Sequence, residues 1–373
     1  EKYPVVTDSI ELKSLKIGES NSSTASLTLG ANSIKCTGET DAFINYGNLI
    51  LTDSGRIKKS DTPINDIEHG TVTYAGNGTD GTITDFSDGD NADYYNLVIS
   101  SGTWKNAGSI KTKFFSATGG SVYLGTSNGN KFNVANELYI SGNTTFFTAG
   151  EITASSITLG KQFTLEADTT FGTSTAASSI TLDYDFTNEN PISTAGNKLI
   201  FNSTIDGGKS FVTTGEGTVT FNNTVGSTTP LSSIYIAGPV VINTTEIKTS
   251  GTQTYENAIT LASDTKLTAK TVTFDGNVNG EKALAITGDS IFKGTVGYSQ
   301  PLTSLSVSKT TKIVATAITS NSNQTYSGAV TVSSEAILKA TGTDSSITFS
   351  DSIIGSKKLT VDAKAKFTNT AAT

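Results

Sequence analysis

Segments in the second half of the chain recur at a spacing of about 71 residues. Gln253-Thr254-Tyr255 returns as Gln324-Thr325-Tyr326. Val225-Gly226 returns as Val296-Gly297 at the same spacing. Such evenly spaced copies are typical of a solenoid, whose core grows by stacking repeated units. A tandem of β-sandwich domains is the alternative, because short strands about 8 to 12 residues apart suit both folds. Identical spacing at many matched positions favours the solenoid.

Short runs that alternate apolar and polar residues occur throughout the chain. Leu27-Thr28-Leu29 and Val272-Thr273-Phe274 are examples, and Gly, Asn, Asp or Ser clusters bound most of these runs. A period of two predicts short β-strands. The segment Ser155–Leu159 also returns further along the chain as Ser178–Leu182. We therefore predict an all-β fold, a right-handed parallel β-helix of about 15 coils, each of about 23 to 25 residues.

We expect one continuous solenoid with two parts. Residues 1–135 would form an N-terminal part with capping segments and irregular acidic loops. Residues 136–373 would form a regular β-helix with a three-coil repeat of about 71 to 75 residues. Residues 53–93 are rich in Asp, Gly and Asn. We expect a side loop there, and a binding loop within residues 53–115.

Composition argues against several classes of protein. The formal net charge is −8 and Arg56 is the one arginine, so we expect no nucleic-acid partner. One His and one Cys leave little for a metal or a disulfide, and Cys36 has no partner within the chain. No run approaches about 18 apolar residues, so we expect no membrane-spanning helix. The chain has no Met and opens on Glu1, and we expect a mature or excised piece of a longer protein.

Three coils carry a family resemblance. They are Phe43–Leu51, then Gly70–Tyr74 followed by Tyr94–Ser100, and the two copies that begin at Gln253 and Gln324. These segments resemble coils of the filamentous-haemagglutinin-like and autotransporter-passenger adhesins, which are bacterial surface β-helix proteins. The resemblance covers most of the chain. It implies an exported, extracellular or cell-surface location, and it transfers no catalytic residue.

Two short motifs test for a carbohydrate-active enzyme. Arg56-Ile57-Lys58 and His69-Gly70 resemble motifs of pectin-degrading hydrolases. In those enzymes the histidine motif comes first and paired aspartates precede both, whereas here the order is reversed and no adjacent Asp pair lies upstream. Glycoside hydrolysis uses two carboxylates that face one bond. We expect no catalytic residue and no cofactor, and we interpret Arg56 and His69 as surface residues.

Acidic and aromatic residues near position 90 are the remaining candidates for a site. Asp88, Asp90 and Asp93 are a weak Ca²⁺ candidate, because Ca²⁺ binds several oxygens, but the order of an EF-hand is absent. A solvated acidic loop is the favoured interpretation. Tyr94, Tyr95 and Trp104 are candidate ligand contacts, because exposed aromatic side chains stack on sugars or proteins. Core packing or capping of a coil end is the favoured interpretation of these rings.

Together these observations predict a non-enzymatic, exported bacterial surface protein that acts as an adhesin shaft. Its partner would be a host or environmental surface glycan or protein, and its open β-helix ends could allow self-association. A β-helical carbohydrate-active enzyme, or a protein like a tail fibre, is the first alternative. A purely structural surface filament or spacer is the second.

Overall fold

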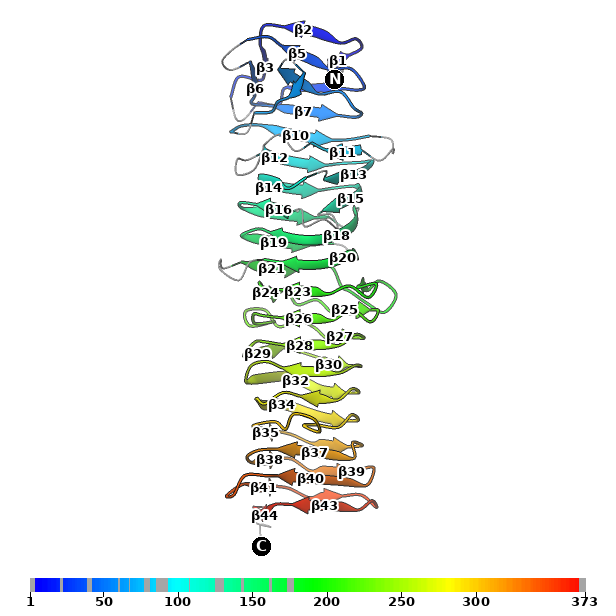
Figure 1. Cartoon of the computed structure of the whole chain (residues 1–373), viewed down its shortest axis with the longest axis vertical. Coiled ribbons are helices and arrows are strands. Elements are labelled where there is room, and N and C mark those ends of the chain that lie inside the picture. Colours follow the sequence, from blue (N-terminus) through cyan, green and yellow to red (C-terminus); the bar gives the residue numbers. More distant parts are fainter. Residues whose placement is uncertain are drawn as a thin grey trace. The chain divides into compact units, whose positions relative to one another are not determined.

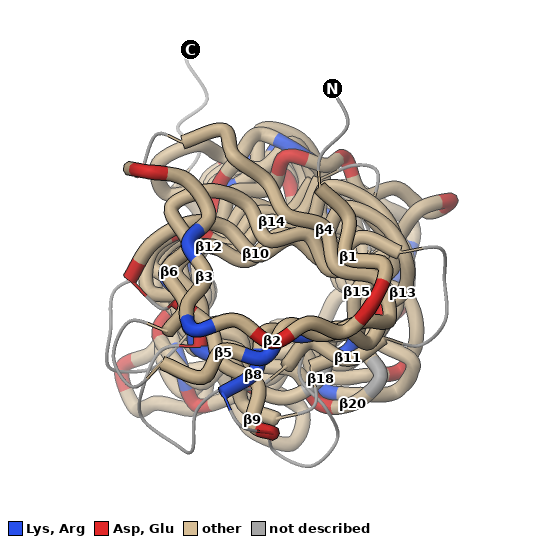
Figure 2. The backbone as a smooth tube through the Cα atoms, turned by 90° about the horizontal axis from the view of Figure 1, so that it is seen from above, with Lys and Arg blue, Asp and Glu red and all other residues tan. Residues whose placement is uncertain are grey.

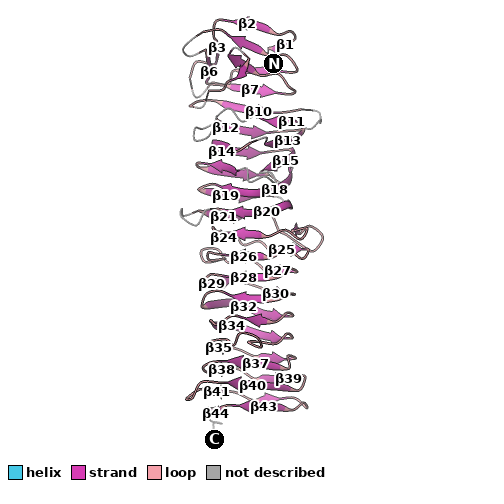
Figure 3. Ribbon diagram, viewed as in Figure 1, coloured by secondary structure: helices cyan, strands magenta, loops and turns pink. Residues whose placement is uncertain are grey.

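The chain folds into coils of parallel strands. The computed structural model describes residues 4–20, 23–38, 42–59, 61–66, 68–76, 81–84, 93–106, 108–124, 131–141, 144–160, 163–172 and 178–368. It is an all-β solenoid of about 16 turns, and its described residues contain no helix (Figures 1 and 3). The predicted β-solenoid is confirmed. The chain divides into two compact units, Glu1–Tyr184 and Asp185–Thr373, which are described separately below.

The first unit contains β1 to β21. Their bounds are β1 Val5–Val6, β2 Ile10–Leu12, β3 Leu15–Ile17, β4 Ser26–Leu29, β5 Ile34–Cys36, β6 Phe43–Asn45, β7 Asn48–Leu51, β8 Ile57–Lys59, β9 Thr62–Pro63, β10 Thr71–Tyr74, β11 Gly81–Ile83, β12 Tyr94–Ile99, β13 Thr103–Asn106, β14 Ile110–Ala117, β15 Gly120–Leu124, β16 Lys131–Val134, β17 Glu137–Ile140, β18 Thr144–Thr153, β19 Ser156–Leu159, β20 Phe163–Phe171 and β21 Ser179–Leu182.

The second unit contains β22 to β44. Their bounds are β22 Ile192–Ser193, β23 Leu199–Phe201, β24 Thr204–Asp206, β25 Phe211–Thr214, β26 Val219–Phe221, β27 Ile234–Ile236, β28 Val240–Ile242, β29 Glu246–Lys248, β30 Thr252–Tyr255, β31 Ile259–Leu261, β32 Thr265–Phe274, β33 Val278–Asn279, β34 Ala283–Phe292, β35 Ser304–Val307, β36 Thr311–Ile313, β37 Ala317–Ser320, β38 Gln324–Tyr326, β39 Val330–Val332, β40 Ala336–Ala340, β41 Ser346–Phe349, β42 Ile353–Ile354, β43 Leu359–Asp362 and β44 Lys364–Phe367.

In the first unit, strands of successive coils pair in parallel ladders around the interior. One ladder runs through β1, β4, β7, β10 and β12. A second contains β2, β5 and β8, and a third contains β3 and β6. Figure 2 shows β1, β4 and β10 on one side of the coil, β2, β5 and β8 on the opposite side, and β3 and β6 on a third. Parallel stacking satisfies the backbone groups of each coil through the coils above and below it.

Alternation along each strand places one set of side chains inside the coil. In β7 and β10, Leu49, Leu51 and Val72 are buried, and so is Cys36 in β5. Burial raises the pKa of the Cys36 thiol, because an apolar environment disfavours the thiolate. Cys36 is a free, buried cysteine. The apolar positions of the alternating runs are therefore the core, as the period of two predicts.

The second unit also has parallel ladders, and many of its coils are shorter than expected. In one ladder Ile236 pairs with Tyr255, Tyr255 with Phe274, and Phe274 with Phe292. The difference between these residue numbers gives coils of about 18 to 19 residues, whereas we expected about 23 to 25 residues. The expected length holds for other coils, such as those in which Phe211 pairs with Ile234 and Tyr74 with Ile99. The first unit contains short coils too, because Ile99 pairs with Ala117, so coil length varies within each unit.

Shorter coils change the number of coils that one repeat of about 71 residues spans. From Gln253 the same ladder is reached again at Val272, Ser290 and Thr311, which completes three coils. Gln324 lies farther along the fourth coil, in the ladder of β35 and β38. The repeat thus spans about three and two-thirds coils and moves each motif to another ladder, whereas the sequence suggested three coils. The repeat itself is confirmed, because both copies have the same local geometry.

The glycines of the repeat show that shared geometry. Gly226 and Gly297 have φ of 70° and 67°, in the left-handed region that favours glycine. A Cβ at Gly226 would collide with the carbonyl oxygen of Lys248, and one at Gly297 with that of Thr319. Each is therefore a corner at which the chain turns against the backbone of a neighbouring coil.

Aromatic side chains stack along the interior of the second unit. The rings of Tyr255 and Phe274 lie 5.9 Å apart and within 14° of parallel. Those of Phe274 and Phe292 lie 5.2 Å apart and within 5°. Register places identical positions of successive coils above one another, so one ring per coil becomes a column. Each such aromatic pair adds about 0.5 to 1.5 kcal/mol beyond the area it buries.

Candidate ligand-binding groove

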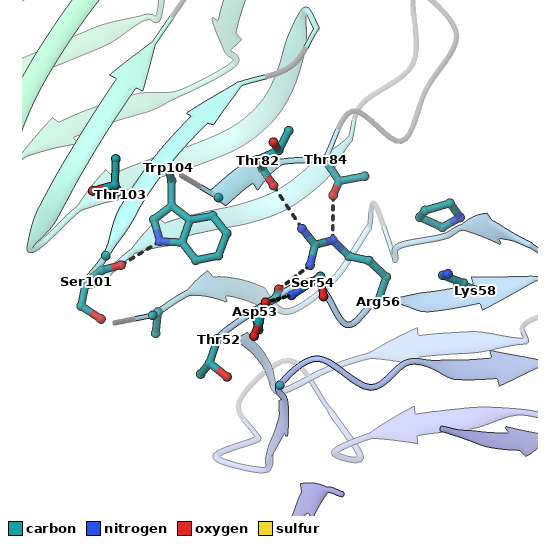
Figure 4. Close-up of a pocket in the computed structure, with 16 residues that line it drawn as sticks. Thr52, Asp53, Ser54, Arg56, Lys58, Thr82, Thr84, Ser101, Thr103 and Trp104 are labelled. Atoms are coloured by element: carbon teal, nitrogen blue, oxygen red, sulfur yellow. Dashed lines mark hydrogen bonds between the residues drawn. The ribbon is translucent and has the colours of Figure 1, made fainter. Parts of the chain in front are cut away.

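A groove of about 910 Å³ opens on the first unit. One wall follows the chain just after β7, β10 and β12, at Thr52, Ala75 and Ser101. The opposite wall contains Arg56 and Lys58 near β8, and Thr82 and Thr84 near β11. Figure 4 shows the guanidinium of Arg56 and the indole of Trp104 in this space. The volume lies in the range of about 300 to 1,000 Å³ that is usual for small-ligand sites.

The groove forms where a ladder of strands is interrupted. Strand β8 pairs with β5 on one side and makes an antiparallel pair with β9. Strand β11 pairs with β13. These two described strands, β8 and β11, do not pair with each other. The far edge of β8 is paired with β9, so no strand links β8 to β11 and a space opens between these two coils.

The Arg56 side chain spans this interruption. Its Nε donates to Thr84 Oγ1 at 2.8 Å, and Nη2 donates to the Thr82 carbonyl at 3.1 Å. Its Nη1 donates to the carbonyls of Asp53 and Gly55, both at 2.8 Å. Four of the five guanidinium N–H groups are therefore used, and all four acceptors are neutral. The positive charge is held in place without being neutralised.

Two buried tyrosines hold the backbone to which Arg56 binds. The Tyr94 hydroxyl donates to the Thr84 carbonyl at 2.6 Å, and the Thr84 N–H donates to the Tyr74 hydroxyl at 3.0 Å. The two hydroxyls lie 2.7 Å apart, and Tyr74 is left to donate to Tyr94. Burial, and then the neighbouring Tyr74, raise the pKa of Tyr94 well above its ordinary value. The Tyr94 phenol therefore stays protonated, and Thr84 is fixed beneath Arg56.

Trp104 packs beside Tyr74. Its ring centroid lies 4.7 Å from that of Tyr74, at 66°, and its Nε1 donates to the Ser101 carbonyl at 2.7 Å. Only 3% of Trp104 is exposed. A Cβ at Gly81 would collide with the indole ring, and one at Gly76 would lie 3.4 Å from it. Glycine at position 81 thus makes room for the indole, whereas a Cβ at Gly76 would lie 2.8 Å from the Thr52 carbonyl oxygen.

The charges that line the groove are two cations and one carboxylate. The Lys58 side chain forms no ion pair or hydrogen bond with the described residues, and Arg56 forms none with a described acidic side chain. Asp53 is exposed, and its Oδ1 accepts the Ser54 N–H at 2.7 Å. Among the described residues the lining therefore carries a net positive charge, on a chain whose formal net charge is −8.

The three predicted aromatic contacts lie in different environments. Tyr94 is fully buried beneath the groove, and Trp104 lies at its edge. Tyr95 is half-buried on the other face of the same strand, with its ring 6.0 Å from that of Phe114. The Lys113 ammonium lies 4.9 Å from the centre of the Tyr95 ring. Ligand contact by Tyr95 stays a prediction, and Tyr94 is packed in the interior.

The predicted Ca²⁺ candidate is only partly described. Asp88 and Asp90 lie outside the described residues. Asp93 is fully buried, and its Oδ2 accepts the Lys111 N–H at 2.7 Å. In the described part of the chain, no three His, Cys, Asp or Glu side chains gather as they would around a metal ion. Calcium binding at these aspartates stays a prediction.

The two motifs that suggested an enzyme do not meet in the groove. Arg56 lines it, whereas His69 is not among the lining residues. His69 Nδ1 lies 3.4 Å from Asp66 Oδ2, and its ring lies 4.6 Å from that of Tyr46. Asp66 Oδ2 also accepts the Asn45 N–H at 2.8 Å, so this carboxylate fixes a turn of the backbone.

The groove residues that sequence reasoning missed are Thr82 and Thr84. They follow Arg56 by 26 and 28 residues, which is about one coil. Residues separated by one coil lie side by side in a solenoid. The two threonines one coil after the single arginine were therefore the signal that could have indicated its hydrogen-bond partners.

No protein-family model, curated protein or solved structure matches the chain. The described residues also include no helix of the length and apolarity that crossing a membrane requires. The functional proposal therefore rests on the fold and the groove.

Proposed function

We propose that this chain is a non-enzymatic, exported bacterial surface protein whose solenoid displays a binding surface, in the manner of an adhesin shaft. The observation that carries the proposal is the arrangement of each unit as in-register parallel coils with apolar ladders inside. Such coils extend a surface with every added turn and need no further core. Ser and Thr, roughly 29% of the chain, suit the exposed positions of the strands.

The groove supports binding more than glycoside hydrolysis. Asp53 is the one carboxylate among its lining residues, whereas glycosidases use a pair. Arg56 is bound by four neutral acceptors, which suits a fixed recognition group.

Two measurements test the proposal. Antibodies against the chain should label intact cells of its source organism as strongly as permeabilised cells. The purified chain should bind a subset of a glycan and matrix-protein array and leave the bound glycans uncleaved. Labelling only after permeabilisation would contradict export to the surface. Release of new reducing ends would favour the enzyme, a threefold assembly would favour a fibre, and an array without any binding would favour a spacer.

A further inference from the structure

We propose that the groove between β8 and β11 binds an acidic oligosaccharide, with Arg56 and Lys58 holding its anionic group. This inference deepens the proposed function, because it assigns a ligand class and a site to the displayed surface. It rests on the charge, the length and the lining of the groove.

The charge of the groove selects an anion. Arg56 has one N–H on Nη2 without a partner among the described residues, and Lys58 has three such N–H groups on its ammonium. Lys35, the register partner of Lys58, is in contrast paired with Glu11 at 3.6 Å. An ammonium and a guanidinium that line one groove without a counter-ion among the described residues attract a carboxylate or a sulfate. Asp53 opposes this attraction and limits its strength.

The direction of the groove selects an elongated ligand. Gly30, Thr52, Ala75 and Ser101 line it and follow β4, β7, β10 and β12, which are neighbouring strands of one ladder. Neighbouring strands lie about 4.8 Å apart, so these four positions span about 14 Å. A short oligomer that lies across the coils would fill this length, whereas a single small anion would not.

The lining selects a saccharide over a peptide. Its side chains are mostly Thr, Ser and Gly, and Trp104, Pro63 and Ala75 supply the apolar surface. Sugar hydroxyls can pair with threonine hydroxyls and backbone carbonyls, and a pyranose ring can lie against small residues and an indole edge. A peptide usually needs a free strand edge or apolar side-chain pockets. Strands β7, β10 and β12 follow one another in one ladder, and β8 is paired with β5 and β9. The Thr82 carbonyl of β11 already accepts from Arg56, so a peptide strand finds little free edge in the groove.

Trp104 provides the readout, because it is the one tryptophan of the chain and lines the groove. The full chain would be titrated with a β-1,4-linked glucuronate tetramer while its intrinsic fluorescence is recorded. Cellotetraose is the neutral counterpart with the same linkage. Sulfated cellotetraose tells a carboxylate preference from a sulfate preference, and a tetraglutamate peptide tests for the other class of anion. Calorimetry with the same four probes gives dissociation constants independent of the fluorophore.

Four variants make the test specific. Lys58→Gln should weaken binding of the glucuronate tetramer about three- to tenfold, because one ion contact is lost. Arg56→Gln should weaken it about tenfold or more, on the order expected for a charged hydrogen bond. Asp53→Asn should strengthen it about two- to threefold. Lys312→Gln, an exposed β36 position in the other unit, carries the same charge change as Lys58→Gln and should leave binding unchanged.

The expected result is a fluorescence change with an acidic tetramer, about tenfold or more weaker binding of cellotetraose, and weaker binding at about 0.5 M salt. If cellotetraose binds equally well, if Lys58→Gln and Lys312→Gln have the same effect, or if tetraglutamate binds most tightly, the inference is wrong. Lys58→Gln keeps the test valid if Arg56→Gln misfolds, since the Lys58 side chain has no described partner to lose. If the chain binds the array but the groove variants have no effect, the inference is wrong and the proposed function stands. If the groove binds the tetramer but the chain is not on the cell surface, the proposed function is wrong and the inference stands.

Discussion

The duplicated Gln–Tyr pair of the second unit allows a quantitative test of how the coils are held together. Gln253 is fully buried, and its Nε2 donates to the carbonyls of Ile247 and Thr268 at 3.2 and 3.1 Å. The Tyr255 hydroxyl donates to Gln253 Oε1 at 3.2 Å. Burial raises the pKa of Tyr255, so its phenol remains a donor at all ordinary pH values. The perturbation is Tyr255→Phe, which removes one oxygen and leaves the packing intact.

The expected cost follows from the partner that is left behind. In Tyr255→Phe, Gln253 Oε1 loses its donor in a place that water does not reach. A buried acceptor without a partner costs about 1 to 3 kcal/mol. Gln253→Leu leaves the phenol without its acceptor and should cost at least as much. The double variant removes both groups, so it should cost about 1 to 2 kcal/mol less than the sum of the single variants.

The second copy of the pair supplies an internal control. Gln324 Nε2 donates to the carbonyls of Ile318 and Lys339 at 3.2 and 2.8 Å, and the Tyr326 hydroxyl donates to Gln324 Oε1 at 2.9 Å. Hydrogen exchange followed by mass spectrometry reports local opening free energies for both strands in one sample. Tyr255→Phe should speed exchange in β30 and leave β38 unchanged, because coils interact mainly with their neighbours.

Two outcomes would refute this reasoning. One is a change below about 0.3 kcal/mol in β30 for Tyr255→Phe, which would mean that the hydrogen bond contributes nothing. The other is full additivity of the two single variants, which would mean that Gln253 and Tyr255 do not depend on each other.

Three further predictions concern other parts of the chain. Gly226→Ala should lower the urea midpoint more than Gly196→Ala, because both have positive φ but only at Gly226 would a Cβ collide with a neighbouring coil; equal midpoints would contradict this. The Cys36 thiol should react with a maleimide only after unfolding, since it is buried and its pKa is raised; fast labelling of the folded chain would count against the structure. A hydrogen bond to Glu256 raises the pKa of Tyr235 from its ordinary 10.0 to about 12, so the stability this contact adds should be present below the ordinary pKa and lost as the pH rises through about 12. Glu256→Gln should move that phenol titration, followed by ultraviolet absorbance, back towards the ordinary value, and an unmoved titration would argue against the contact.

Much of the fold could be predicted because the residue pattern of each short segment indicates its local structure. Alternation in Val272–Phe274 indicated a strand and its buried face, and Gly226 marked a corner. In Leu27–Leu29 alternation indicated the strand, although only Leu29 is fully buried. The number of coils per repeat could not be predicted from the same signals. The length of a coil depends on connections that carry no period, and a repeat of about 71 residues fits either three long coils or about three and two-thirds short ones.

The site was harder to predict because it depends on what is adjacent across coils. Trp104 lies in a run in which Lys105 is exposed and Asn106 is buried, so alternation already placed the indole inside. Tyr94 gave no such signal, because β12 is not strictly alternating: Tyr95 and Asn96 are both half-exposed. The role of Arg56 needed the knowledge that Thr82 and Thr84 lie one coil away, and that requires the register.

The interrupted ladder also explains why the groove is positive. Where ladders are continuous, register brings opposite charges together on neighbouring coils: Lys35 faces Glu11 at 3.6 Å, and Lys266 faces Glu246 at 3.8 Å. Each of these exposed cations has a carboxylate one coil away, and such pairs contribute little to stability but leave no net charge. Strand β8 departs from this pattern, because the register partners of Lys58 are Lys35 on one side and Pro63 of β9 on the other, and neither is a carboxylate. Strand β9 and not β11 pairs with β8, so the break in the ladder leaves Lys58 without a described counter-ion and opens the space that we propose an anion occupies.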